Sequence, residues 1–376
     1  MELRRAIIFT STIALALNLT AAVYADQNAN QFGQGNGHNF NYVGFRSHGA
    51  PVETLGDNGS GYNSAQSDGA PTANLGNGDL SWLQNLIQRL KQNHSNSFYS
   101  PVGSPATGPI SCHLSCQTLT GTIALIPVWV GNWAGSDVTN WNNVLGNIVS
   151  SLGTGTANSV ALPGHVFNTT TLYYTSQSLT PPSLQWVSNL TVTAPTATNV
   201  SDADVATYIG SFIAANPTIV PSGTTPVYIY IGANSTLLTS GFGSTYCGWH
   251  SYGNLTSGGN IPFIAFQDFT STYNKFCAPQ VISPNGSTSL DAMANVMVHE
   301  VDETLTDPFF GGWFDGKGAE SADKCIKTYG TTYLVGSAHY NVQLGSLKYL
   351  IQQNWLENNI VTPTGTSTGT ACSVTG

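Results

Sequence analysis

The stretch SLDAMANVMVHEVDETLTDPFFGGWFDGKGAESADKC (residues 289–325) begins with the strongest helical pattern of the chain. Its apolar side chains recur at intervals of three and four residues, which predicts an amphipathic helix from about Ser289 to Thr306. Pro308 ends this helix. The apolar stripe consists of Leu290, Met293, Met297, Val301 and Leu305. A helix of this kind needs a sheet or other helices to cover the stripe.

The same stretch is crowded with carboxylates. Charged residues make up only 8% of the chain, yet seven of its 19 acidic residues lie within residues 296–325. They are Glu300, Asp302, Glu303, Asp307, Asp315, Glu320 and Asp323. Neighbouring carboxylates repel one another, and only Lys317 and Lys324 are close in sequence to balance them. The cluster is therefore either a metal site or a polar turn rich in capping groups.

The metal interpretation rests on the pattern His-Glu-x-x-Glu. His299 and Glu303 are four residues apart, so they share a helix face opposite the apolar stripe. The pattern differs from the zincin motif His-Glu-x-x-His by one carboxylate, and zinc accepts oxygen ligands. His299 and Glu303 would then bind zinc, and Glu300 would be the general base of a hydrolase. Glu320 or Asp323 would complete the metal ligands, with His250 as a further candidate for the site.

Other interpretations of these residues stay open. Calcium is the alternative ion, because Asp315, Glu320 and Asp323 lie in a Gly-rich loop, although not at EF-hand spacing. A His-Glu pair followed by a second Glu is also common on solvated helix faces without function. Trp249 and Trp313 could line a cleft for a sugar or a peptide, or belong to the core.

The N-terminus predicts export. Arg4 and Arg5 precede the apolar run AIIFTSTIALAL, and small residues near Ala25 predict cleavage of a signal peptide over residues 1–25. A membrane anchor is the alternative, but Asn18 and Thr20 interrupt a run that is already short for a span. An even number of cysteines in an exported chain predicts disulfides, although six cysteines allow 15 pairings. They are Cys112, Cys116, Cys247, Cys277, Cys325 and Cys372. The spacing CHLSC favours a local disulfide over a metal site, since no second pair of this kind follows.

Composition excludes some partners. The net charge is −9, and ten scattered Lys and Arg residues form no basic stripe, which argues against nucleic acid and anionic membranes. A surface of Ser, Thr, Asn, Gly and Tyr suits an extracellular matrix or a cell wall. In a eukaryotic host some of the Asn-x-Ser/Thr sequons would carry glycans. These begin at Asn58, Asn93, Asn168, Asn189, Asn199, Asn234, Asn254 and Asn285.

The chain divides into an extension and one domain. Residues 26–108 are rich in Gly, Asn and Ser, which predicts a flexible extension or propeptide, with one amphipathic helix over residues 80–93. Residues 109–376 alternate apolar β-branched runs with helical patterns. They predict a single α+β or mixed α/β domain, zincin-like, with a mixed sheet and packed helices.

Six further elements are predicted inside this domain. Strands are expected at 122–131, 226–233 and 260–268, and a strand–turn region at 165–177. Helices are expected at 136–153, capped by Ser136 or Asp137, and at 201–216, capped by Ser201 and stopped by Pro217.

Four segments together resemble the EXORDIUM or phosphate-induced protein family, which is extracellular. They are YCGWHSY (246–252), the segment around Cys277, VHEVDETLTDPFFGGWFDG (298–316) and ESADKC (320–325). The resemblance carries over His250, His299, Glu300, Glu320 and Asp323, and it implies the disulfides Cys247–Cys277 and Cys325–Cys372. Two features depart from the family pattern: VDE replaces the usual LAE after His-Glu, and the extension over 26–108 is not a family feature.

The resemblance implies a secreted protein of the matrix or wall, linked to growth and cell expansion. Its partners would be matrix or wall polymers, either peptide or polysaccharide. Two functions follow from the residues and the resemblance together. One is a zinc-dependent, peptidase-like hydrolase, and the other is a non-catalytic structural or carbohydrate-binding matrix protein.

Overall fold

The computed structural model describes residues 110–356 apart from ten short gaps, together with segments 40–42, 47–48, 361–362, 365–366 and 371–373. The gaps are 114–115, 158–159, 162–163, 196–198, 235–236, 239–241, 244–245, 256–258, 270–276 and 316–317. The predicted signal peptide, the helix over 80–93 and the sequons at Asn58 and Asn93 lie outside the described residues.

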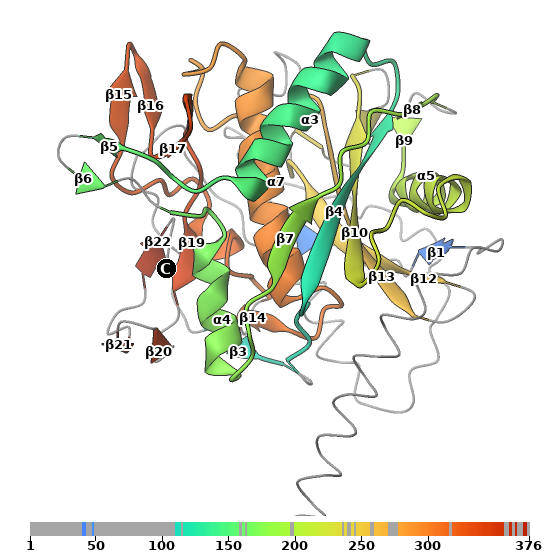
Figure 1. Ribbon diagram of the computed structural model, residues 1–376, viewed down its shortest axis with the longest axis horizontal. Helices are drawn as coiled ribbons and strands as arrows, with labels where there is room; N and C mark the ends of the chain where they lie inside the picture. Colours follow the sequence, from blue (N-terminus) through green and yellow to red (C-terminus); the bar gives the residue numbers. More distant parts are fainter. Residues whose placement is uncertain are drawn as a thin grey trace, which may run out of the picture.

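A mixed sheet forms the centre of the molecule (Figure 1). Its strand order is β7 (Ser183–Trp186), β4 (Thr122–Val130), β10 (Thr224–Gly232), β13 (Asn260–Gln267), β12 (Trp249–Leu255) and β1 (Phe40–Tyr42). The first four are parallel to one another, whereas β12 is antiparallel to both β13 and β1. β2 (Ser47–His48) also pairs with β12, and β8 (Val192–Thr193) pairs with β4. The predicted strands at 122–131, 226–233 and 260–268 are confirmed.

The central strand β4 contains a proline, which cannot donate a ladder hydrogen bond. Pro127 lies between the residues of β4 that pair with β7 and those that pair with β8. The side-chain amide of Asn189 donates to Pro127 O at 2.9 Å and holds the next segment there. Because Asn189 is buried, its predicted sequon is not available to a glycan in this fold.

Helices cover both faces of the sheet (Figure 1). α3 (Gly135–Ser150) and α7 (Thr288–Thr306) lie on one face, and α5 (Asp202–Ala215) lies on the other. Ser201 caps α5, as predicted, and it forms a capping box with Asp204. The predicted cap of α3 was wrong: the N-cap is Ala134 and makes no side-chain hydrogen bond, while Asp137 lies in the first turn.

The predicted strand–turn region over 165–177 was also wrong. These residues form a 3-10 turn, η1 (Asn168–Thr170), followed by α4 (Thr171–Ser176). The threonines and tyrosines suggested a strand. Instead, the hydroxyls of Thr170 and Thr171 each donate a hydrogen bond to the backbone carbonyl three residues earlier, which stabilises the tight turn. Tyr174 is fully buried and donates to Leu305 O at 2.7 Å, so tertiary packing outweighs the strand propensity here.

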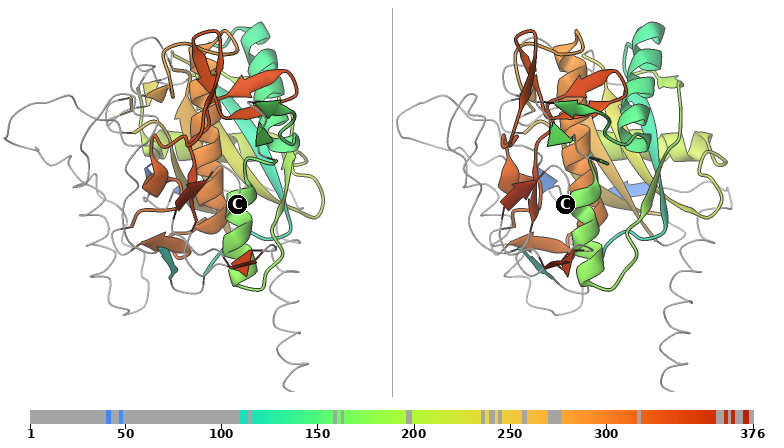
Figure 2. Two further views of the ribbon diagram at one scale, coloured as in Figure 1. Left: turned by 90° about the vertical axis from the view of Figure 1, so that its left-hand side faces the viewer. Right: turned by 60° about the vertical axis from the view of Figure 1, so that its left-hand side comes forward.

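The C-terminal part covers the outer side of α7 with short hairpins (Figure 2). The C-terminal pairs are β15 (Tyr333–Val335) with β16 (Ala338–Tyr340), β17 (Val342–Leu344) with β18 (Leu347–Tyr349), β19 (Asn354–Leu356) with β22 (Ala371–Ser373), and β20 (Val361–Thr362) with β21 (Gly365–Thr366). Elsewhere in the domain, β5 (Thr156–Ala157) pairs with β6 (Val160–Ala161), β9 (Asn199–Val200) with β11 (Leu237–Leu238), and β3 (Ile110–Cys112) with β14 (Trp313–Asp315). A second 3-10 turn, η2 (Asp323–Cys325), follows β14. α7 is thus enclosed between the sheet and these hairpins.

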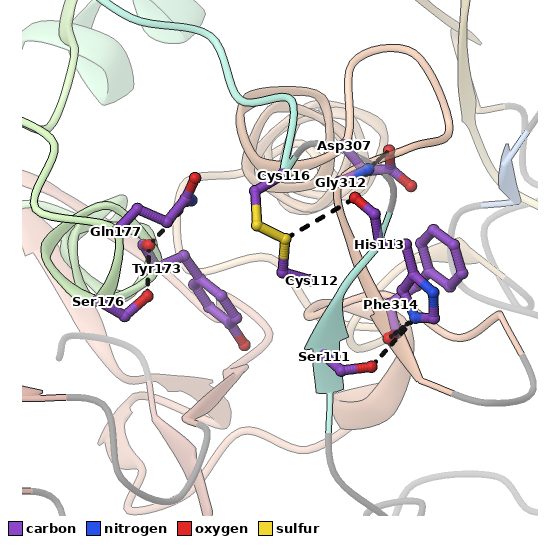
Figure 3. Close-up of a disulfide and its surroundings, with 10 residues drawn as sticks. All are labelled: Ser111, Cys112, His113, Cys116, Tyr173, Ser176, Gln177, Asp307, Gly312 and Phe314. Atoms are coloured by element: carbon purple, nitrogen blue, oxygen red, sulfur yellow. Dashed lines mark hydrogen bonds between the residues drawn. A yellow bond between two sulfur atoms is a disulfide. The ribbon is translucent and has the colours of Figure 1, made fainter. Parts of the chain in front are cut away.

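All six cysteines are paired: Cys112–Cys116, Cys247–Cys277 and Cys325–Cys372. These are the local pair that the CHLSC spacing favoured and the two pairs that the family resemblance implied. Figure 3 shows the first of them beside the turn that follows α7. His113, between its two cysteines, donates its backbone N–H to Gly312 O and stacks its ring on Phe314. This histidine fixes β3 against β14 and is not directed at a metal.

Candidate metal centre

The helix α7 carries three of the predicted site residues into the interior. Its N-cap Ser287 accepts a hydrogen bond from Leu290 N, and every residue from Leu290 to Thr306 is buried. His299 and Glu303 therefore do not lie on a solvated face, as an isolated amphipathic helix would place them. The imidazole of His299 contacts the carboxylate of Glu303, with Nε2 lying 3.3 Å from Oε1.

Strand β12 brings His250 to the same place. His250 Nδ1 lies 3.5 Å from Glu300 Oε2 and 3.7 Å from Glu303 Oε2. Gly248 permits this approach, because a Cβ there would lie 2.5 Å from a methyl group of Val296 and 2.9 Å from Glu300 Oε1. The side chains of His250, Glu300 and Glu303 have no solvent-exposed surface.

The segment after β14 supplies the remaining carboxylates. Asp323 N donates to Glu303 Oε1 at 3.0 Å, and Asp323 Oδ1 lies 3.6 Å from His299 Nε2. Glu320 Oε1 lies 3.7 Å from His250 Nε2. Next to Asp323, the buried Lys324 pairs with Asp315 at 3.2 Å, and Cys325 is tied to Cys372. This ion pair and this disulfide hold the segment against α7.

Two overlapping groups of possible ligands result, and they share Glu303. One group is His299, Glu303 and Asp323, and the other is His250, Glu300 and Glu303. Each carboxylate oxygen of Glu303 faces one histidine: Oε1 faces His299 and Oε2 faces His250. Two ligands bound tetrahedrally to zinc at about 2.1 Å lie roughly 3.4 Å apart. The distances between the histidine nitrogens and the carboxylate oxygens within these groups are similar, at 3.3 to 3.7 Å.

Several of these atoms have no hydrogen-bond partner within the described residues. They are His250 Nδ1, His299 Nε2, Glu303 Oε2 and both carboxylate oxygens of Glu300. Buried polar atoms are normally satisfied, so a group of unsatisfied donors and acceptors gathered around Glu303 calls for an explanation. A cation bound among them would satisfy them.

The second ring nitrogen of each histidine has a defined neighbour. His250 Nε2 donates to Asp307 O at 3.3 Å, which leaves a lone pair on Nδ1 directed at Glu300 and Glu303. Metal-binding histidines commonly donate their other N–H to a backbone carbonyl in this way. His299 differs, because Gln352 Nε2 lies 3.1 Å from its Nδ1 and also donates to Ala322 O. Gln352 was not predicted, since no motif marks it in the sequence.

Burial changes the proton affinities of the cluster. Desolvation lowers the pKa of His250 to about 3, so its imidazole is neutral. Desolvation raises the pKa of Glu303 to about 7 and that of Glu300 well above its usual range. Burial also opposes the charge of His299, but Glu303 and Asp323 raise the pKa of His299 well above 6.5. In the absence of a metal, the 3.5 Å contact between His250 and Glu300 therefore joins two neutral groups.

The structure brings together six of the predicted site residues: His250, His299, Glu300, Glu303, Glu320 and Asp323. It does not place Trp249 and Trp313 with them. Trp249 is fully buried and packs edge-on against Phe263, while Trp313 packs against Tyr173 in a separate cluster. Neither indole is exposed as a platform for a sugar. Phe310 lies beside the cluster instead, with its ring centre 5.6 Å from that of His250 and a positive φ of 58°.

Comparison with known proteins places this cluster inside a conserved region. Residues 112–345 match the family described as the phosphate-induced protein 1 conserved region, and all six residues lie within the match. A relative is EXORDIUM-like 3 from Arabidopsis thaliana, which is 36% identical over 95 residues. That alignment covers 22% of this chain and only 28% of the relative. No solved structure is similar to the chain. Among the described residues, no helix is long and apolar enough to cross a membrane.

Proposed function

Because the chain belongs to the phosphate-induced protein 1 family, we propose that it is an exported, growth-related matrix protein built around one buried zinc ion. The extracellular setting is supported by the family, by the three disulfides and by the signal-like N-terminus. The observation that carries the zinc proposal is the convergence of two histidines on one carboxylate. His250 and His299 come from different elements, and each faces a separate oxygen of Glu303.

We assign the ion to His250 Nδ1, His299 Nε2 and both carboxylate oxygens of Glu303, a set that takes one histidine from each of the two groups and is neither group as it stands. Two imidazoles and one glutamate form a donor set that catalytic zinc sites use. Asp323 supports the set from outside, since its backbone N–H orients Glu303 and its carboxylate lies near His299. Glu320 has the same supporting position next to His250. The sequence alone suggested Glu320 or Asp323 as the further ligand. In this assignment the further ligand is His250, which lies on β12.

Glu300 is the residue that would make such a centre hydrolytic. It belongs to the zincin-like pattern, lies beside the ligands and is not needed to hold the ion. Zinc held there would supply a water of lowered pKa, and the Glu300 carboxylate beside the ligands would accept the proton of that water. The substrate class proposed is a peptide or similar amide.

Two observations favour a non-catalytic role for the same cluster. Five of its six side chains are at most 3% exposed, and only Asp323, at 12%, reaches the surface. Gln352 donates toward His299 Nδ1, which places the proton of neutral His299 on Nε2, the atom that a metal would need. In this second candidate function, hydrogen bonds or a closed metal site join α7, β12 and the segment around Asp323, and the protein acts as a structural component of the matrix.

Zinc binding and peptide hydrolysis, measured side by side, distinguish the two roles. Full-length protein loaded with zinc is incubated with a mixture of extended peptides, and products are read by mass spectrometry. The catalytic role predicts cleavage that Glu300→Gln abolishes while the zinc content stays near one per chain. Unchanged zinc with no cleavage by the wild type would leave the structural role. If Glu300→Gln loses the zinc, Glu300 is a ligand and the assignment of a general base is wrong.

A further inference from the structure

Four of the Asn-x-Ser/Thr sequons lie wholly within the described residues, and the fold divides them into two kinds. They begin at Asn168, Asn189, Asn199 and Asn285. The sequence pattern does not distinguish them, because it marks an acceptor without showing whether the folded chain has room for a glycan. The surroundings of each asparagine in the structure do distinguish them.

The side-chain amide of Asn189 is used inside the domain. Asn189 is 8% exposed, its Nδ2 donates to Pro127 O at 2.9 Å, and its Oδ1 accepts from Thr191 N at 3.0 Å. The amide thus joins the central strand β4 to the segment before β8. A glycan on Nδ2 would place a bulky polar group at a buried contact, where there is no room for it.

Asn285 is held in a similar way at the start of α7. Its Nδ2 donates to Asp291 Oδ1 at 3.0 Å and to Lys348 O at 2.6 Å, so both of its N–H groups are used. Its Oδ1 accepts from Lys348 N at 3.0 Å. Because a glycan replaces one amide proton, it would break one of the two donated bonds. Asn189 and Asn285 are called the engaged asparagines below.

Asn168 and Asn199 are both exposed. In the turn η1 the next two residues, Thr169 and Thr170, are buried, so Asn168 is the one that faces solvent. Asn199 is the exposed first residue of β9 and is followed by buried Val200. Neither side-chain amide donates or accepts a hydrogen bond within the part of the chain that the structure describes. Figure 1 shows β9 well apart from α4, which directly follows η1, so the two sites lie on separate parts of the surface.

The hydroxyl groups of these two exposed sequons are engaged in the folded chain. Thr170 Oγ1 donates to Phe167 O at 2.6 Å, and the Ser201 hydroxyl belongs to the capping box with Asp204. An enzyme that recognises the triplet needs the hydroxyl as well as the amide, so the transfer must precede folding of these turns. The fold then selects among the modified chains. A glycan on an exposed asparagine stays in solvent, whereas one on an engaged asparagine prevents the native contacts.

We propose that export through a eukaryotic secretory pathway gives the folded protein N-linked glycans at Asn168 and Asn199, and none at Asn189 and Asn285. The co-reactant is an oligosaccharide linked to a lipid pyrophosphate. The amide nitrogen attacks the anomeric carbon, a C–N bond forms, the bond from that carbon to the pyrophosphate oxygen breaks, and the amide loses one proton. The lipid pyrophosphate is the leaving group. The proposal rests on the export in the proposed function and does not depend on a bound metal.

Mapping the glycans on the full-length protein secreted by eukaryotic cells tests the two sites. An amidase that removes N-glycans in water labelled with heavy oxygen converts each modified asparagine to labelled aspartate, which mass spectrometry locates. We expect label at Asn168 and Asn199 and none at the engaged asparagines. Label at an engaged asparagine, or no label at either exposed one in the secreted protein, would overturn the proposal. A chain that stays in the cytosol without glycans would contradict the export itself, and with it both sites.

Two matched variants test whether the fold decides the outcome at Asn189. Thr191→Ala removes the sequon but keeps the amide of Asn189 and both of its backbone partners, so the secreted amount should equal that of the wild type. Asn189→Gln also removes the sequon but displaces the amide from Pro127 O, and the secreted amount should fall several-fold. Equal secretion of the two variants would overturn the structural use of Asn189. Asn168→Gln and Asn199→Gln should each lose one glycan, seen as faster migration on a gel.

Discussion

His250 Nδ1 lies 3.5 Å from Glu300 Oε2, although one residue stands on the outermost strand of the conserved sheet and the other in a buried helix. His250 uses its Nε2–H on Asp307 O, so its Nδ1 lone pair faces two carboxyl groups. This arrangement is stable only if a proton or a cation lies between them. The predictions below separate these two cases.

Gly248→Ala should weaken both the fold and the zinc site. The new methyl group would meet Val296 and Glu300 at distances that force β12 away from α7. We expect a loss of about 1–3 kcal/mol in the free energy of unfolding, as for other overpacked sites, and a measurable loss of zinc affinity. Urea unfolding and zinc titration measure the two effects. Gly135→Ala is the matched control, since nothing lies within 4 Å of its Cβ position. Equal behaviour of both variants would contradict the close packing.

Glu303→Gln should abolish zinc binding more completely than Glu300→Gln. Glu303 contacts both histidines, whereas Glu300 contacts only His250 among them. The amide retains the shape of the side chain but removes the charge that zinc requires. Competition with a zinc chelator measures the affinities of the two variants. A larger loss in Glu300→Gln would place the ion nearer to Glu300 and revise the ligand set.

The metal-free protein should become less stable as the pH rises from 6.5 to 7.5. The folded pKa values of Glu303 and Asp307 are raised from 4.5 and 3.8 to about 7, and that of His299 is raised above 6.5. The stability that these groups contribute is complete below their unfolded pKa values and is lost as the pH passes their folded values. The lowered pKa of His250 has the opposite effect on stability: its contribution is lost as the pH falls below 6.5, so it does not change between pH 6.5 and 7.5.

Zinc should reverse this pH dependence, because it binds the deprotonated ligands. Thermal unfolding of the same protein at pH 6.5 and 7.5, with chelator and with zinc, measures both slopes. A stabilisation by zinc that does not grow between the two pH values would contradict a site built from these groups.

Loss of the Cys325–Cys372 disulfide should impair the site more than loss of Cys112–Cys116. The first joins residues 47 apart and anchors the segment next to Asp323, whereas the second joins residues four apart. Loop-closure entropy predicts a destabilisation of roughly 4 kcal/mol for the first and about 2 kcal/mol for the second. Paired Cys→Ser variants, compared by urea unfolding and zinc titration, test this order. An equal zinc affinity of both variants would show that Asp323 is positioned without the disulfide.

The sequence predicted the helix over 289–306 and the buried strands well, because their apolar periodicity is regular and their ends carry clear signals. It also predicted that His299, Glu300 and Glu303 share a helix. It could not predict that the whole helix is enclosed, since the hairpins over α7 are short strands of weak periodicity. The role of Gly248 and the contact of Gln352 with His299 depend on tertiary approach and leave no local pattern. The strand predicted at 165–177 failed because β-branched and aromatic residues can also pack on a buried helix.

The central claim is a zinc ion held jointly by α7 and β12, and the most direct test is the zinc content of the full-length secreted protein. Elemental mass spectrometry of the wild type should give about one zinc per chain. His250→Ala and His299→Ala should each lose it, whereas His165→Ala, which changes a histidine that contacts Val149 O elsewhere in the domain, should retain it. A wild-type protein that contains no zinc and takes up none on incubation would contradict the account and leave a buried proton network in its place.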